Sequence, residues 1–186
     1  MLWMWVVLLL AVPARGEQAD RTELAAFQHR LDQYVALHQR LEGPLPALQV
    51  SSDMSEVHRL MTALRTKLQA SRKNERRGSL LTPGVVTIMR ARIAASVTID
   101  DIAETTEAVE EHTPPNMRAV QVNLALPEAA PFGFIPPQVL RALPPLPSEL
   151  RYLVLSRMLV VWDHHADLVV DVAPLVFDPA TYRVRR

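Results

Sequence analysis

The chain has 186 residues, of which 49% are hydrophobic, so a single domain with a sizeable core is expected. Its 20 basic side chains balance 20 acidic ones, and nucleic acid is therefore not an expected partner, because nucleic-acid-binding domains normally carry a basic excess. The absence of cysteine excludes a disulfide scaffold, a thiolate metal site, a catalytic cysteine and a lipoprotein anchor.

Residues 1–16 are typical of a secretory signal peptide. An uninterrupted apolar run from Met1 to Val12 precedes small residues at signal-peptidase spacing, which places cleavage after Ala14 or Gly16. No lysine or arginine precedes the run, and the run is shorter than the ~20 residues that a membrane-spanning helix needs. We therefore expect an exported protein, periplasmic or secreted; an uncleaved anchor or a buried first helix is the alternative.

Residues 17–112 form the predicted helical region. Apolar residues at alternating three- and four-residue steps predict amphipathic helices over 19–42 and about 54–77. A glycine–proline loop at 43–46 separates them, so we expect an antiparallel helical hairpin. His38 lies on the apolar side of the first helix and is interpreted as a polar residue that sets the register of packing.

Capping residues predict where the other helices begin and end. Asp53 is the expected N-cap of the second helix, and Gly78 is its expected C-terminal cap. Thr82 followed by proline predicts the start of a third helix. Thr98 is the expected cap of a short, acidic fourth helix over 99–111.

The segment from Arg65 to Arg92 is strongly basic and is followed in sequence by the acidic fourth helix. One interpretation is weak surface contact with an anionic envelope polymer or with lipid headgroups. The other is that the basic and acidic segments face each other or are simply solvated. Apart from such contact, a membrane is expected to matter only for the signal peptide.

Residues 113–148 form a proline-rich extended connector. Alternating apolar residues predict one strand within it, Met117–Leu126, and Gln138–Leu143 is expected to form one helical turn. Because the connector also contains many large apolar side chains, we expect it to wrap across the core rather than to act as a free linker.

Residues 149–186 are predicted to form a β-meander and a tail, with strands at Arg151–Leu155, Met158–Trp162 and Leu168–Val172 and a tight turn at Ser156-Arg157. Both faces of this meander are apolar, whereas antiparallel sheets usually leave one face polar. Either the helices and the connector cover both faces, or a second copy of the chain does. The fold class is therefore α+β, mostly α: a helical hairpin, two shorter helices, a wrapping segment and a small antiparallel sheet.

The end of the chain resembles the C-terminal segment of a group of uncharacterised bacterial exported proteins. The resemblance covers about the last third of the chain. It implies export and the form of the C-terminal segment but no chemical activity. It departs from the group's pattern at Ser156, where the group has glycine, and at Leu153, where it has arginine. The matching residues are Leu143, Pro144, Leu146, Pro147, Leu150, Tyr152, Arg157, Leu159, Asp163, Ala166, Leu168, Val170 and Asp171.

Asp163, His164, His165 and Asp167 are the one local cluster of metal-type ligands in the sequence. Adjacent histidines in an extended chain point to opposite faces, which favours the other interpretation, a solvated turn with aspartate as the turn former.

Asp171 falls, by alternation, on the apolar face of Val169 and Trp162, and a buried carboxylate needs a partner. We expect a structural ion pair with Arg151 or Arg157.

No motif for nucleophilic, metal-protease, phosphate-binding or dinucleotide-binding chemistry is present, so neither an enzyme nor a cofactor is expected. The leading hypothesis is an exported, non-enzymatic envelope or periplasmic protein that acts by self-association or by binding an envelope protein partner. The alternative is a periplasmic metal-responsive binding protein that uses the Asp163-His164-His165 loop.

Overall fold

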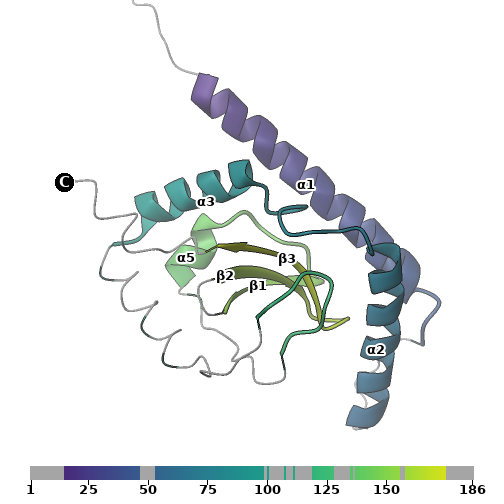
Figure 1. Cartoon of the computed structure of the whole chain (residues 1–186). Helices are drawn as coiled ribbons and strands as arrows, with labels where there is room; N and C mark the ends of the chain where they lie inside the picture. Colours follow the sequence, from purple (N-terminus) through teal and green to yellow (C-terminus); the bar gives the residue numbers. More distant parts are fainter. Residues whose placement is uncertain are drawn as a thin grey trace, which may run out of the picture.

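The computed structural model describes residues 15–46, 53–98, 119–127, 137–155 and 158–174, together with the single positions 100, 107, 111 and 135. The chain has the predicted α+β, mostly α fold, with helices first and a three-stranded antiparallel sheet at the C-terminal end (Figure 1). The sheet order is β1-β2-β3, so each strand pairs with the next along the chain and β1 and β3 are the edges.

The helices and strands follow the predicted order. Their bounds are α1 (Arg15–Glu42), α2 (Met54–Ser71), α3 (Pro83–Ser96), α5 (Pro137–Ala142), β1 (Leu150–Leu155), β2 (Met158–Asp163) and β3 (Leu168–Pro174). The predicted fourth helix lies outside the described residues except at isolated positions, and the predicted turn at Ser156-Arg157 lies outside them entirely.

Two of the predicted caps are confirmed. The Asp53 carboxylate accepts the backbone N–H of Ser55 at 2.9 Å at the start of α2. The Thr82 hydroxyl accepts the N–H of Val85 at 3.2 Å at the start of α3, where proline occupies the first turn. Each cap satisfies a backbone donor that a helix start leaves without an intrahelical acceptor.

The prediction for the end of α2 is wrong. The helix ends at Ser71 rather than at residue 77, and the backbone N–H of Arg72 closes its last turn on the carbonyl of Leu68 at 2.9 Å. Gly78 lies in the following loop with φ of 85°, a conformation that glycine adopts without a side-chain clash. It caps nothing in α2; its backbone N–H instead donates to Asp171.

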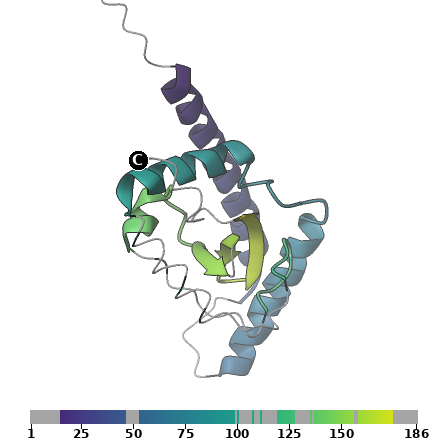
Figure 2. The same ribbon diagram turned by 60° about the vertical axis from the view of Figure 1, so that its left-hand side comes forward.

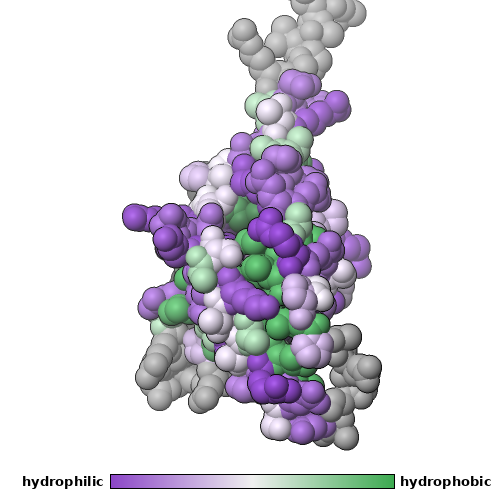
Figure 3. All heavy atoms as spheres, turned by 90° about the vertical axis from the view of Figure 1, so that its right-hand side faces the viewer, coloured by the Kyte–Doolittle hydropathy of each residue, from purple (hydrophilic) through white to green (hydrophobic). Residues whose placement is uncertain are grey.

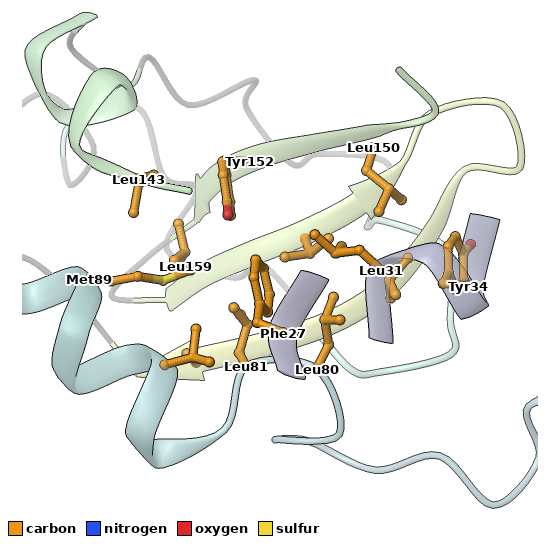
Figure 4. Packing of buried hydrophobic residues seen from close by; sticks show 14 of the residues in the cluster. Phe27, Leu31, Tyr34, Leu80, Leu81, Met89, Leu143, Leu150, Tyr152 and Leu159 are labelled. Atoms are coloured by element: carbon orange, nitrogen blue, oxygen red, sulfur yellow. The ribbon is translucent and has the colours of Figure 1, made fainter. Parts of the chain in front are cut away.

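The helices cover one face of the sheet. Apolar side chains from α1, from the loop before α3 and from α3 itself point onto the strands (Figure 4). Full burial of each large apolar side chain contributes about 1.5–3 kcal/mol to stability. The residues at the centre of this packing are Phe27, Leu31, Tyr34, Leu80, Leu81, Met89, Leu143, Leu150, Tyr152 and Leu159.

The connector covers the other face, as one of the two predicted alternatives requires. Val120, Val122 and Leu126 pack against the apolar residues on that face of the strands. Two backbone hydrogen bonds of 2.8 Å, from Asn123 N–H to the Val169 carbonyl and from Val169 N–H to the Leu124 carbonyl, attach the connector to the outer edge of β3. The connector thereby lies beside both β3 and α2 (Figure 2).

The strand predicted over Met117–Leu126 is not formed in its described part, residues 119–126. The chain turns there instead, and Asn123 adopts φ of 66°. The turn lets Gln69 of α2 donate to the Asn123 carbonyl at 2.9 Å, while the Asn123 amide donates to the Gln69 carbonyl at 3.2 Å. Reciprocal contacts with α2 therefore replace a regular strand ladder.

A β-bulge in β3 changes which face Asp171 occupies. Val161 pairs with Asp171 while its neighbour Trp162 pairs with Val169, so Val170 is the extra residue. The extra residue shifts the alternation of side chains by one position. Asp171 consequently lies on the helix-covered face with Val161, and not on the face of Trp162 as predicted.

Asp171 is fully buried, and its partners among the described residues are backbone groups. Its carboxylate accepts the N–H of Gly78 at 2.9 Å, Leu80 at 2.7 Å, Leu81 at 2.8 Å and Val172 at 2.7 Å. The loop between α2 and α3 is thus fastened to β3.

The predicted ion pair between Arg151 and Asp171 is wrong. Arg151 lies on the opposite face of the sheet, paired with Trp162, and its guanidinium donates at 2.8 Å to the carbonyls of Ser148 and Leu150. The other predicted partner, Arg157, lies outside the described residues.

We expect Asp171→Asn to lower the free energy of unfolding by about 2–4 kcal/mol, because an amide nitrogen replaces an oxygen that accepts buried backbone donors. Urea unfolding followed by circular dichroism measures this, with Asp20→Asn on the exposed side of α1 as the control. Equal stability of the two variants would contradict this role of Asp171.

Candidate metal centre

The C-terminal half of α1 faces the turn between β2 and β3. Tyr34, His38 and Glu42 are four residues apart and therefore lie on one side of α1. That side meets Asp163, the last residue of β2, and His165 in the turn that follows. Residues from the two ends of the described chain thus form one polar cluster.

Asp163 is fully buried at the middle of this cluster. Its Oδ1 accepts the backbone N–H groups of His165 and Ala166, both at 3.0 Å, which fixes the turn. Its Oδ2 accepts the Tyr34 hydroxyl at 2.6 Å and lies 2.6 Å from Nδ1 of His38. The carboxylate therefore holds both the turn and the facing side of α1.

His38 is fully buried and has a carboxylate on each side of its ring. An ionised carboxylate can only accept hydrogen bonds. Nδ1 of His38 therefore carries the proton in its hydrogen bond to Asp163. Nε2 faces the other way and lies 3.0 Å from Oε2 of Glu42. The ring orientation is fixed from both sides.

Glu42 links His38 to His165. Its Oε1 lies 3.1 Å from Nδ1 of His165, and these two side chains remain about a third exposed, at 32% and 34%. The metal-ligating atoms of His38, Glu42 and His165 all lie within 4.8 Å of one another. Two imidazoles and a carboxylate therefore converge at the surface end of the cluster.

The electrostatics of the buried pair favour the charged forms. Burial alone would lower the pKa of His38, but its hydrogen bond to Asp163 and the negative charges of Asp163 and Glu42 outweigh burial and raise it. Burial alone would raise the pKa of Asp163, but the hydrogen bond and charge of His38 and the Tyr34 hydroxyl lower it. Burial, with the charge of Asp163, raises the pKa of Tyr34, so its phenol remains a neutral donor.

The structure separates most of the ligand set predicted for the loop. His164 Nε2 lies 2.9 Å from the Ser148 carbonyl, and Asp167 accepts Nη1 of Arg65 at 2.6 Å. Asp163 is buried and contacts only the Nδ1 side of His38. Of the predicted set, only His165 belongs to the group of converging ligand atoms, and it does so with His38 and Glu42.

Sequence reasoning identified His38 as a polar residue on an apolar seam but did not identify Glu42. The spacing of four between them was a usable signal, because it places both on one side of a helix. Nothing local in the sequence connects either residue with His165.

A pocket of about 480 Å³ opens beside the cluster. Glu42 and His165 form its polar wall with Gln39, and Leu60 and Leu64 of α2 form part of its apolar wall. Apolar residues gather in a strip bordered by polar ones on the side of the molecule where α1 and α2 lie (Figure 3).

No known protein family, curated protein or solved structure gives a match to this chain. The resemblance to exported bacterial proteins therefore stays a prediction. Within the described residues, no helix has the length and apolar character needed to cross a membrane.

We expect stability to fall as the pH rises above neutrality. The folded-state pKa of His38 is raised, so its contribution is complete below the ordinary value of about 6.5 and is lost as the pH rises through the folded value. The contribution of Asp163, whose pKa is lowered, is present above about 3.9 and is lost at more acidic pH. Urea unfolding across pH should show a maximum between these limits.

Urea unfolding of two variants across the same pH range identifies the group responsible for the decline in stability. His38→Asn should remove the decline above neutrality, whereas His29→Asn on the exposed side of α1 should retain it. Imidazole NMR of the unaltered protein separates His38 from His165, which also faces Glu42. A His38 signal that titrates below pH 6.5 would contradict the argument.

Proposed function

We propose that this protein binds a divalent transition metal of the zinc class through His38 Nε2, a Glu42 carboxylate oxygen and His165 Nδ1. The supporting observation is that one ligand atom from each of these three side chains lies within 4.8 Å of the others, at the edge of a pocket. The proposal replaces the loop-based ligand set with one that α1 and the β2–β3 turn supply together.

The spacing of the ligands suits a tetrahedral ion. Metal–ligand bonds of about 2.0–2.1 Å place adjacent ligand atoms about 3.3 Å apart. Glu42 oxygens lie 3.0 Å from Nε2 of His38 and 3.1 Å from Nδ1 of His165. Oε2 makes the first contact and Oε1 the second, so the carboxylate would turn as metal bonds replace these two hydrogen bonds.

The donor set indicates which metals fit. Imidazole with carboxylate suits zinc, nickel and copper, whereas calcium and magnesium prefer oxygen ligands throughout. A fourth position would be left to water or to a ligand from the pocket. We assign binding, and no reaction, to this centre.

Asp163 is the feature that distinguishes the centre from a chance meeting of surface histidines. A histidine that binds a metal through one nitrogen usually donates its other N–H to a carboxylate or carbonyl, which fixes the tautomer and the ring. His38 has this arrangement already, with Nδ1 held by Asp163 and Nε2 directed to the other ligands.

Export to the periplasm or beyond is part of the proposal and is supported by the apolar run before Ala14. Self-association or partner binding was predicted from surplus apolar surface on the sheet. The segment 119–127 packs on that surface, so the observation that motivated self-association is accounted for within one chain.

We expect calorimetric titration of the full chain with zinc, nickel and copper to show one site with a dissociation constant of about 10 µM or tighter. His165→Ala and Glu42→Gln should each weaken binding at least about tenfold, since each removes one ligand. His164→Ala, the neighbouring histidine of the same turn, is the matched control and should leave affinity unchanged. Equal losses in the two histidine variants, or only millimolar binding, would reject the centre.

We also expect metal affinity to rise with pH. Nε2 of His38 must lose its proton before it can bind a metal, and the pKa of His38 is raised. Zinc titrations at pH 6 and pH 8 should therefore show tighter binding at pH 8. Titrations in buffers of different ionisation enthalpy should show proton release, and binding without proton release would exclude His38 as a ligand.

A further inference from the structure

A second pocket, of about 250 Å³, lies against α1 and the end of α2. It is lined by two arginines, Arg30 of α1 and Arg72 just after α2, and by polar residues that include Gln33, Ser71 and Ser79. The metal centre uses none of these side chains.

Arg72 is buried, with 7% of its surface exposed. Its Nη2 donates to the Val170 carbonyl at 2.9 Å, and its guanidinium carbon lies 5.0 Å from the centre of the Tyr34 ring. Its Nη1 is buried and has no hydrogen-bond partner. One face of this guanidinium is therefore held in place while a donor remains unused.

Arg30 lies one helical turn before Tyr34, on the same side of α1. Its Nε and Nη2 are also buried without a hydrogen-bond partner. The Glu23 carboxylate lies 3.7 Å from Nη2 and already accepts the Thr82 hydroxyl. Among the described residues, the ion pair of Arg30 is therefore long and its partner is shared.

Unused donors of this kind require an explanation. A buried donor without an acceptor costs free energy, and the cost is larger for a charged group. A guanidinium cannot escape by losing its proton, because it stays charged in proteins. Within the described residues, no carboxylate lies within 4 Å of Arg72. An acceptor from outside the chain would satisfy these donors.

We propose that this pocket binds a small oxyanion, a carboxylate or a phosphate, between Arg30 and Arg72. Arginine presents its N–H groups as a planar fork that matches two oxygens of such an anion. The hydroxyl and amide side chains of Ser71, Ser79 and Gln33 line the same space and offer further donors. The pocket suits a small anion and not an extended polymer, so it gives one part of the basic segment Arg65–Arg92 a defined ligand class.

Glu75 also lines the pocket, and its exposed carboxylate opposes a bound anion. Substitution of Glu75 therefore tests whether the ligand is negatively charged. Glu75→Gln removes a like charge and should tighten anion binding severalfold, whereas Arg30→Gln should weaken it at least about tenfold. Arg59→Gln, at an arginine of α2 that is 72% exposed, is the matched control and should have no effect.

The experiment is titration of the full, metal-free chain with inorganic phosphate, acetate and chloride, followed by calorimetry and by thermal unfolding. Saturable binding of phosphate or acetate, absent for chloride, is expected, and the stronger of the two identifies the oxyanion. Arg30→Lys keeps the charge but loses the fork, so it should fold normally and still bind more weakly. No binding beyond that of chloride, or equal effects of Arg30→Gln and Arg59→Gln, would overturn the proposal.

Discussion

The buried carboxylate of Asp163 connects the first helix of the described chain with its last hairpin. One oxygen fixes the turn by accepting two backbone N–H groups, and the other accepts Tyr34 and faces His38. A charge in this position is tolerated only because every acceptor site has a partner. The orientation of His38, and with it the proposed metal centre, depends on this one side chain.

The second buried carboxylate, that of Asp171, has a different kind of partner. Asp171 receives backbone N–H groups from the loop before α3, and within the described residues it forms no ion pair with an arginine. Fixed backbone donors lose less conformational freedom than a long side chain does when they are immobilised. The consequence is that three hydrogen bonds to β3 fix the position of the α2–α3 loop, which contains no helix or strand.

Local patterns were enough to predict α1, α3, the start of α2, the N-caps Asp53 and Thr82 and the three strands of the sheet, because periodicity and capping depend on neighbours in sequence. The bulge was not predictable, since its extra residue, Val170, has the same apolar character as the residues around it. That single residue moved Asp171 to the other face of the sheet and made the predicted Arg151 partner unreachable.

The candidate site was predictable only in part, for a related reason. The turn containing His165 was evident as a cluster of metal-type ligands, and His38 was evident as an exception on an apolar seam. Their meeting depends on how α1 crosses the sheet, which is a property of packing between distant segments. In the same way, the burial of Arg72, one of many cations in the basic segment Arg65–Arg92, depends on the packing of α1 and β3 around it.

The contact between the connector and β3 has a consequence for how the protein behaves at high concentration. β3 is an edge strand with apolar residues on both faces, and such a strand offers its free N–H and C=O groups to any other chain. Asn123 and Leu124 occupy these groups at Val169, and the bulge breaks the regular spacing of those that follow. By occupying these groups, the proline-rich connector hinders edge-to-edge aggregation of β3 with other chains. Its composition alone would not suggest this role.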